Sequence, residues 1–250
     1  MIQRLHVLFY CLPSNRLRLT IISYISKDRL SKMIEIIVFL FSVYVLHFSY
    51  EPVKKQLLSV TEHFSDLDEI KQYYVIKNLL KACYLCFLVV VAIVFFGPYL
   101  FYGLWPNALL RSLAGMYVSN DIVGLYRVQK LKTSTRLHHF TSLVFLIMSW
   151  TIDFQESKVA KLLFLYTFAS ATTFPVNAYL GLRLCYDKES QADLCGTAYY
   201  TYAIVCFLNW ILHLYLFDIS CLGYYMLILF IVYDDIILLK WLHKQHTSNH

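Results

Sequence analysis

Long apolar runs separated by short polar segments dominate the hydropathy pattern of this chain. A helix needs roughly 20 apolar residues to cross a hydrocarbon core of about 30 Å. The pattern therefore predicts an all-α, polytopic transmembrane helical bundle with about seven spans, of which the first and the fourth are short. The expected spans are Ile34–Tyr50, Leu79 to about Leu104, about Ala108 to Val128, Leu137–Ile152, Val159–Leu184, about Thr197 to Phe217, and Leu222–Leu242.

Composition supports an integral membrane protein. Hydrophobic residues make up 59% of the 250 residues and charged residues only 15%, whereas charged residues are near a quarter of a soluble domain. The apolar runs do not alternate with period two, so an outer-membrane β-barrel is a poor interpretation. The net charge of +6 resides mainly in loops and tails, which favours contact with anionic lipid headgroups or phosphates and gives no indication of a nucleic-acid partner.

Polarity along the chain suggests three parts. Residues 1–78 comprise a basic interfacial segment over residues 1–33, the first span, and a polar stretch at 51–78 expected to be a water-exposed loop or surface helix. Residues 79–242 form the main transmembrane domain, and residues 243–250 are a polar tail. Lys and Arg residues concentrate in the loops on one side, which predicts a cytosolic C-terminus. The basic N-terminal segment then falls on the opposite side, unless it lies along the membrane or the first span does not cross.

Ionisable residues inside the apolar runs are the first candidates for chemistry. Asp121 lies in the third run, and the adjacent pair His138 and His139 opens the fourth. Such groups are costly in hydrocarbon and normally face a protein interior or a wet cavity. Histidine suits proton transfer or acyl capture, and Asp121 can orient an imidazole from the next helix. A structural hydrogen bond between helices explains the same residues about equally well.

The helical period separates the two histidines. It places His138 on the same face as Thr141 and Ser142, and it turns His139 by about 100° towards Leu143 and Leu146. We therefore expect His138 to carry the polar face of this helix.

Other polar residues in the spans are candidates for substrate binding, with helix packing as the alternative. We expect Pro175 to kink the fifth span. In the last span, one of Asp234 and Asp235 is expected to reach the cytosolic headgroups, and the pair is expected to be too exposed for a catalytic role. Cys83 and Cys86 form a CxxC without a second zinc-ligand pair, so we expect no metal and no bound cofactor. The candidate binding residues are Asn120, Thr141, Ser142, Ser170, Thr173, Asn177, Asn209 and His213, with Arg127 and Arg136 in the basic connection before the histidine pair.

Three of these segments resemble the TLC family, the multi-span domain shared by ceramide synthases, translocon-associated membrane proteins and several lipid-regulating proteins. The matching segments are the acid in YVSND at 117–121, the histidine pair followed by Thr141, and SATTFPVNAYLGLR at 170–183. The resemblance covers about residues 79–242.

The resemblance implies a function in lipid metabolism. In ceramide synthases an acyl group passes from acyl-CoA to the amine of a sphingoid base. By position, His138 and His139 would be the acid/base or acyl-accepting residues, and Asp121 a supporting acid. From the charge of the loop from Arg127 to Arg136, we infer that it attracts the phosphates of CoA. Membrane lipids, acyl-CoA and a sphingoid base are the implied partners, and the endoplasmic reticulum or a related endomembrane is the implied location.

The sequence departs from the ceramide synthases after the histidine pair. Their motif continues with a further His-Asp and a later aspartate, whereas residues 142–161 contain no histidine and only Asp153 as an aspartate. This departure favours the other branches of the family. For those branches lipid binding, control of membrane composition or trafficking is implied more often than catalysis, so a non-catalytic role is the alternative.

Overall fold

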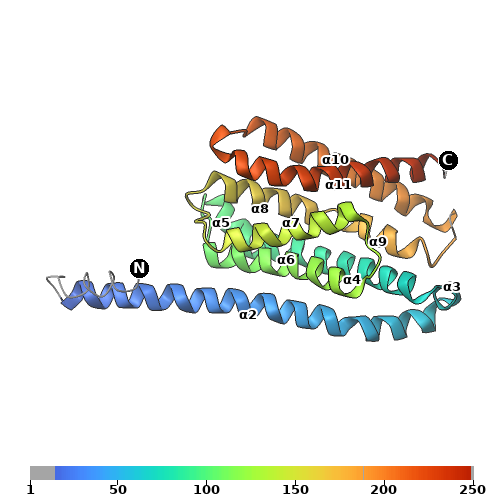
Figure 1. Ribbon diagram of the computed structural model, residues 1–250, viewed down its shortest axis with the longest axis horizontal. Helices are drawn as coiled ribbons and strands as arrows, with labels where there is room; N and C mark the ends of the chain where they lie inside the picture. The colour runs from blue at the N-terminus through green and yellow to red at the C-terminus, as the bar shows by residue number, and fades with distance from the viewer. Residues whose placement is uncertain (1–14, 188, 249–250) are drawn as a thin grey trace.

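The computed structural model describes residues 15–187 and 189–248, and every regular element in that part of the chain is a helix (Figure 1). The predicted all-α fold is thus confirmed there. Of the interfacial segment expected at 1–33, the first 14 residues lie outside the described residues, and the rest begins the long first helix. The elements are α2 (Asn15–Val60), α3 (Glu62–Ser65), α4 (Glu69–Val91), the π-helix η1 (Ala92–Phe96), α5 (Gly97–Phe101), α6 (Asn107–Arg127), α7 (Thr133–Ser149), α8 (Lys158–Ala171), α9 (Phe174–Leu182), η2 (Glu189–Gln191), α10 (Ala192–Tyr215), η3 (Ile219–Cys221) and α11 (Leu222–Thr247).

Five helical segments are long and apolar enough to cross a membrane: Leu30–Val60, Glu69–Phe101, Lys158–Leu182, Glu189–Tyr215 and Ile219–Thr247. Large apolar side chains on their outer faces are exposed, which is favourable in lipid and costly in water. These features indicate a multi-pass membrane protein. The helices α6 and α7 are not among the five, because charged and polar residues interrupt α6 and α7 has only 17 residues. The count of seven spans therefore stays a prediction.

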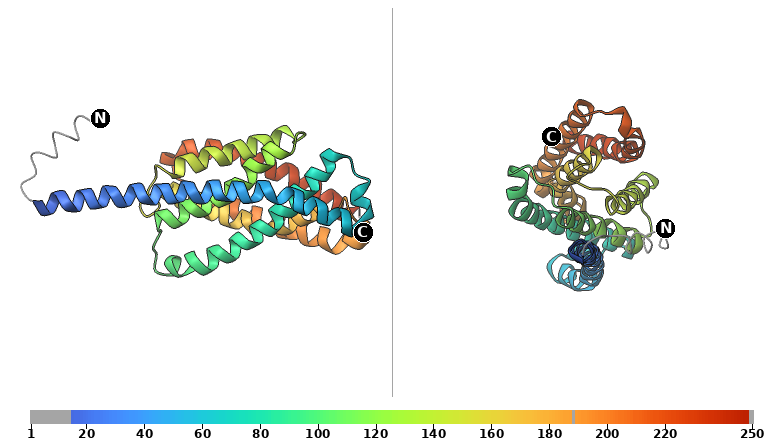
Figure 2. Two further views of the ribbon diagram at one scale, coloured as in Figure 1. Left: turned by 90° about the horizontal axis from the view of Figure 1, so that it is seen from below. Right: turned by 90° about the vertical axis from the view of Figure 1, so that its left-hand side faces the viewer.

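The helices close into a ring. Around it, α4 packs on α6, α6 on α7, α7 on α11, α11 on α10, α10 on α9, and α9 back on α4. The helix α8 contacts α4, α6 and α10, whereas α2 lies against α6 and α4 from outside. The end-on view in Figure 2 shows α2 outside the other helices. The ring encloses the interior in which the polar residues of α4, α6, α7 and α11 meet.

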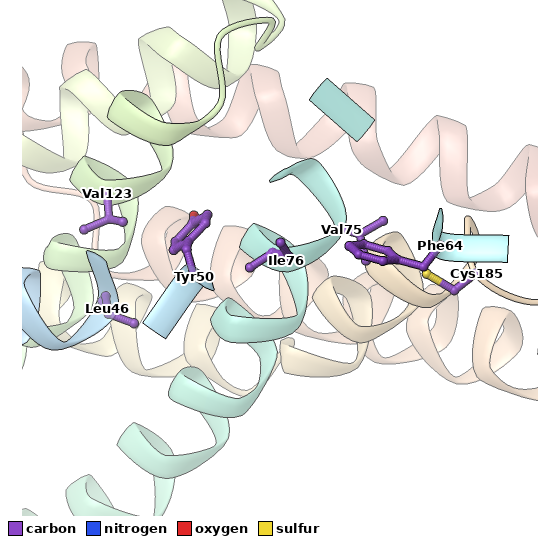
Figure 3. Packing of buried hydrophobic residues seen from close by; sticks show 7 residues of the cluster. All are labelled: Leu46, Tyr50, Phe64, Val75, Ile76, Val123 and Cys185. Atoms are coloured by element: carbon purple, nitrogen blue, oxygen red, sulfur yellow. The ribbon is translucent and has the colours of Figure 1, made fainter. Parts of the chain in front are cut away.

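The polar stretch at 51–78 is only partly exposed, which corrects the expectation for its second half. Asp68 caps α4 by accepting the backbone N–H of Lys71, and this bond lowers the pKa of the Asp68 carboxyl. Beyond the cap, Val75 and Ile76 are buried in an apolar cluster with residues of α2, α3 and α6 (Figure 3). Most polar residues of this stretch lie before α4. The high average polarity of residues 51–78 therefore did not indicate that the first two turns of α4 are amphipathic and partly buried.

The predicted kink at Pro175 is confirmed as a break between two helices. The helix α8 ends at Ala171, and α9 begins at Phe174 with Pro175 in its first turn. Further along α9, a Cβ on Gly181 would lie 2.9 Å from the side chain of Leu79 and 3.3 Å from the carbonyl oxygen of Val75. The missing side chain therefore lets α9 approach α4 closely and close the ring.

Candidate functional site

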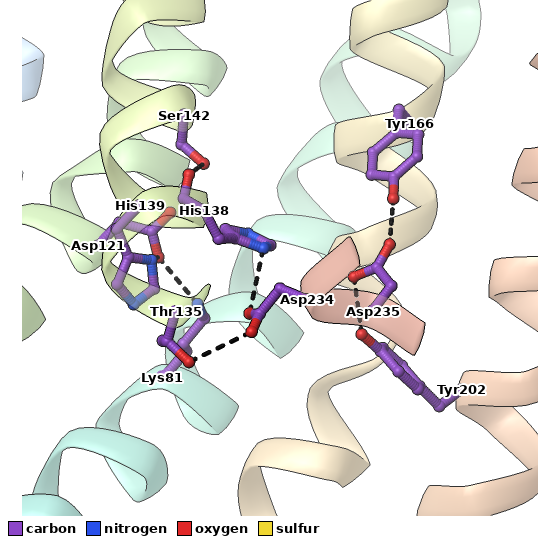
Figure 4. A network of polar contacts seen from close by, with 10 residues as sticks. All are labelled: Lys81, Asp121, Thr135, His138, His139, Ser142, Tyr166, Tyr202, Asp234 and Asp235. Atoms are coloured by element: carbon purple, nitrogen blue, oxygen red, sulfur yellow. Dashed lines mark hydrogen bonds and ion pairs between the residues drawn. The ribbon is translucent and has the colours of Figure 1, made fainter. Parts of the chain in front are cut away.

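Asp121 on α6 forms the centre of a buried charged cluster (Figure 4). Its Oδ1 accepts a hydrogen bond from Lys81 Nζ of α4 at 2.9 Å and lies 3.0 Å from His139 Nδ1 of α7. The carboxylate is 1% exposed, so the ammonium of Lys81 offsets a charge that would otherwise be very costly. The expectation that Asp121 meets an imidazole from the next helix is confirmed, and the imidazole is that of His139.

His138 contacts a second carboxylate, from the last helix. Its Nδ1 lies 3.5 Å from Asp234 Oδ2, and Thr135 Oγ1 donates to Asp234 Oδ1 at 3.4 Å. The two imidazoles stand edge to face with ring centroids 5.5 Å apart. Both histidines thus have an acidic partner, and assigning the polar face to His138 alone was wrong. A helical period orders residues within one helix but does not reveal which neighbouring helix supplies their partners.

Asp235 is also buried inside the ring, so the expectation that the Asp234 and Asp235 pair is too exposed to belong to the site was wrong. The hydroxyl groups of Tyr166 and Tyr202 both donate to the Asp235 carboxylate, the latter at 2.8 Å. The side chain of Asp234 is 15% exposed and Asp235 as a residue 6%. Two adjacent acids inside the apolar run ILFIVYDDIILL were the signal in the sequence, and Lys81 inside LLKACYLCFL was another.

Several atoms of the cluster have no hydrogen-bond partner, although they are buried. Within the described residues these include Asp121 Oδ2, His138 Nδ1 and both ring nitrogens of His139. The 3.0 Å contact between His139 and Asp121 is short enough for an ion pair but lacks hydrogen-bond alignment. Most buried polar atoms in proteins are hydrogen-bonded, so these unpaired atoms call for a partner such as water, an ion or a ligand in the adjoining space.

Two cavities adjoin at this cluster. The larger, of about 330 Å³, is a polar chamber that contains His138, His139, Lys81, Asp234 and Asp235 in its wall. The smaller, of about 70 Å³, is lined mainly by apolar side chains of α4, α6, α7 and α8. Three residues line both cavities: Tyr117, His138 and Ser170. His138 therefore stands at the boundary between a polar and an apolar compartment.

The structure brings some of the predicted binding residues to these cavities. Ser170, Thr173 and Asn177 line the polar chamber, and Ser142 lines the apolar pocket. Asn120 and Thr141 are buried beside the site but line neither cavity. Ser170, Thr173 and Asn177 therefore face a cavity, as expected for residues that bind substrate and not for residues that only pack helices together.

The basic connection contributes lysines in place of the expected arginines. Arg127 donates to the His47 carbonyl at 3.1 Å on the outer helix α2, and Arg136 donates to the Gln129 carbonyl at 2.8 Å. Neither arginine lines a cavity, whereas Lys130 and Lys132 both line the chamber. The expectation that Arg127 and Arg136 bind substrate is corrected, because both guanidinium groups bond to backbone carbonyls away from the chamber.

Asn209 and His213 lie in a separate polar contact on α10. His213 Nδ1 lies 2.8 Å from the Asn209 carbonyl oxygen, and its Nε2 lies 2.8 Å from the hydroxyl of Tyr224. Neither Asn209 nor His213 lines a cavity. Both ring nitrogens are paired, so the expected role of Asn209 and His213 in binding substrate is corrected to a structural one.

Asp121, His138 and His139 could also hold a metal ion by geometry alone. Their ligand atoms lie within 4.8 Å of one another. Two histidines and a carboxylate suit zinc and several other divalent metals. However, the ammonium of Lys81 already contacts the carboxylate, and the buried side chain of Lys77 lines the same chamber. The positive charges of both lysines oppose a second cation.

Comparison of the chain with models of known protein families, with curated proteins and with solved structures gave no match. The functional argument therefore rests on the residues of the site.

Proposed function

We propose that the chain is a membrane protein of lipid metabolism that transfers an acyl group from acyl-CoA to a lipid amine, as the ceramide synthases do. The position of His138 in the wall shared by the polar chamber and the apolar pocket carries this proposal. An amphiphile with its polar group in the chamber and part of its chain in the pocket places the carbon between them beside His138. If the amphiphile is an acyl thioester, the carbon beside His138 is its carbonyl carbon.

The residues of the chamber then take complementary roles. The amine nitrogen attacks the thioester carbonyl, so that a C–N bond forms and the C–S bond breaks. His138 accepts the proton that the amine loses and returns it to the departing thiolate of CoA, and Asp234 orients the imidazole. His139 lies beside His138 and is positioned by Asp121, which Lys81 holds in place.

The membrane arrangement is part of the proposal. We propose about seven spans, with α6 and α7 crossing inside the ring where their polar faces meet the chamber. A cytosolic C-terminus and a location in the endoplasmic reticulum or a related endomembrane agree with the basic loops and with a lipid substrate. Membrane lipids, acyl-CoA and a sphingoid base are the proposed partners.

A non-catalytic lipid-binding or membrane-organising protein is the second candidate. The ion pair between Lys81 and Asp121 favours it, because Lys81 neutralises the carboxylate that would otherwise support a charged imidazole. The missing His-Asp segment after the pair points the same way. Under this alternative, the chamber holds a lipid without changing it.

Lipid analysis of a null cell line separates the two candidates. The line expresses the wild type, the His138→Ala/His139→Ala double variant, or His213→Phe at matched protein levels. Acyl transfer predicts an acylated amine lipid that appears with the wild type and with His213→Phe but not with the double variant. Identical lipid profiles for wild type and double variant would reject acyl transfer and favour the binding role.

The purified protein supplies the direct assay. Release of free CoA thiol is measured with palmitoyl-CoA and sphinganine, and the acylated product is identified by mass spectrometry. Thiol release without an amide product would indicate that the protein hydrolyses the thioester and does not transfer the acyl group.

A further inference from the structure

Lys77 is a buried lysine whose ammonium touches no carboxylate of the described residues, although Asp121 and Asp234 attract its charge from a distance. Its side chain is 5% exposed, and it makes no hydrogen bond or ion pair with any residue of the described ranges 30–187 and 189–248. It lines the polar chamber together with Lys81, which lies one helical turn further along α4. A buried ammonium is costly unless it is paired, so this position calls for a negative partner.

The fold provides a dedicated path for the Lys77 side chain. A Cβ on Gly124 of α6 would lie only 2.9 Å from Lys77 Cε and 3.5 Å from its Cδ. The missing side chain at 124 therefore leaves the groove through which the lysine stem crosses α6. Glycine within a helix is less favourable than alanine by about 1 kcal/mol. The close approach of the Lys77 side chain explains why a glycine occupies position 124.

The chamber as a whole has more cations than carboxylates in its wall. Three basic residues from other elements join the two lysines of α4: Lys130, Lys132 and Arg183. The two carboxylates of the wall, Asp234 and Asp235, already contact His138, Thr135 and two tyrosines. Asp121 behind the wall is paired with Lys81. Protein carboxylates thus leave an excess of positive charge that a ligand can neutralise.

We infer that the chamber binds a phosphate group of the ligand, with the Lys77 ammonium as its innermost contact and Lys130, Lys132 and Arg183 around it. A phosphate offers several strong acceptor oxygens, which suits a set of cationic donors that come from three different segments. The apolar pocket beyond His138 then takes part of the attached chain. This inference rests on the lipid-binding chamber of the proposed function but not on acyl transfer. The phosphate group could belong to a phosphorylated lipid or to CoA.

Binding to the purified full-length protein in a phosphate-free maltoside detergent tests the inference. The probes are hexadecyl phosphate, CoA and inorganic phosphate, with hexadecanol as the chain-only control, and the readouts are affinity and thermal midpoint. The variant is Lys77→Met, which keeps the length of the side chain and removes its charge. The matched control is Lys71→Met, which removes an exposed lysine paired with Asp68 on the same helix.

We expect Lys77→Met to weaken binding of the phosphate probe by about tenfold or more, and Lys71→Met to leave it unchanged. Without ligand, Lys77→Met should melt at the same temperature as the wild type or higher, because it removes an unpaired buried charge. Weaker binding without lower stability separates a ligand contact from a structural role. Gly124→Ala keeps the lysine but displaces its stem, so it should also weaken binding and provides a second variant if Lys77→Met does not fold.

The probes distinguish the sources of the phosphate. Lys77-dependent binding of hexadecyl phosphate indicates a phosphorylated lipid, and Lys77-dependent binding of CoA indicates the nucleotide end of acyl-CoA. Lys77-dependent binding of inorganic phosphate alone indicates a small-anion site. The inference is overturned if no phosphate probe binds, or if all bind equally to the wild type and Lys77→Met. In that case acyl transfer that depends on His138 would still stand, so the two proposals fail separately.

Discussion

Two buried histidine sites of this protein differ in how completely their hydrogen bonds are satisfied. In the first, His213 has a partner for each ring nitrogen, at 2.8 Å in both cases. In the second, both ring nitrogens of His139 and Nδ1 of His138 lack a hydrogen bond, although a carboxylate lies near each imidazole. The first arrangement stabilises a contact between α10 and α11, and the second leaves imidazole nitrogens unpaired at the wall of a cavity. Burial of a histidine therefore does not by itself indicate function, whereas unpaired ring nitrogens beside a cavity make it a candidate for binding or catalysis.

Replacing histidines one at a time should give the largest contrast between the two sites. We expect His138→Ala to lower kcat of acyl transfer by about 10²–10⁴-fold, because general acid–base catalysis contributes that much. His213→Phe should leave kcat near the wild-type value and lower stability by about 1–3 kcal/mol, because it leaves the Tyr224 hydroxyl unpaired. Steady-state kinetics and thermal unfolding in detergent measure both effects. A similar loss of kcat in both variants would remove the distinction between the sites.

Breaking the ion pair behind the histidines should have the largest effect on stability. Asp121→Asn leaves the buried ammonium of Lys81 without its partner, which should cost about 3–5 kcal/mol. The double variant Asp121→Asn/Lys81→Met should recover most of this loss, since both charges of the pair are removed together. A double-mutant cycle from unfolding measurements checks the prediction. Additive losses would show that the two side chains do not interact.

A smaller effect is expected at the tyrosines that bond to Asp235. Tyr202→Phe removes a donor from a buried carboxyl group and should lower stability by about 1–3 kcal/mol. Tyr199→Phe on the same helix is the control, because the Tyr199 hydroxyl has no hydrogen bond within the described residues. Equal changes in thermal midpoint for the two variants would contradict the assigned bond.

The exposed cap at Asp68 should respond to pH only modestly. The backbone N–H of Lys71 lowers the pKa of this carboxyl in the folded state. The contribution to stability is therefore fully present above the ordinary carboxyl pKa and is lost as the pH falls through the lowered folded-state pKa. Thermal midpoints between about pH 6 and pH 2 should show this loss in the wild type and not in Asp68→Ser, whose cap does not titrate. Parallel curves would exclude the assigned contribution.

Metal removal should have no effect. The ammonium of Lys81 contacts Asp121, and Lys77 adds a second positive charge to the chamber, so a divalent cation is disfavoured there. Overnight dialysis against a chelator should leave acyl transfer and the thermal midpoint unchanged. Lost activity that zinc restores would identify Asp121, His138 and His139 as metal ligands instead.

The hydropathy pattern predicted the helices better than it predicted the site. Apolar runs of membrane length indicated the all-helical fold, and Pro175 marked the break between α8 and α9. Asp121 and the histidine pair stood out because ionisable residues are rare in such runs. Lys81, Asp234 and Asp235 carried the same signal, yet their partners come from helices that are distant in the chain. Those pairings depend on the order of the helices around the ring, and this order cannot be read from any single apolar segment of the sequence.

The orientation of basic residues was similarly hidden from the sequence. Arg127 and Lys130 are three residues apart in one connection, yet only Lys130 lines the chamber. Arg127 instead reaches His47 on α2. The contacts of each side chain depend on where α2 packs, which the charge pattern of the loop does not reveal.

The ring of helices also sets an order for biogenesis. Lys81 and Asp121 are 40 residues apart, so their pair can form as soon as α4 and α6 have both been made. Asp234 and Asp235 belong to α11, whose partners Thr135, Tyr166 and Tyr202 are 99, 69 and 33 residues earlier in the chain. Until that last helix has been made, His138 and the two buried tyrosines lack their carboxylate partners. A chain halted before α11 is thus expected to be the form that chaperones and quality control of the membrane recognise.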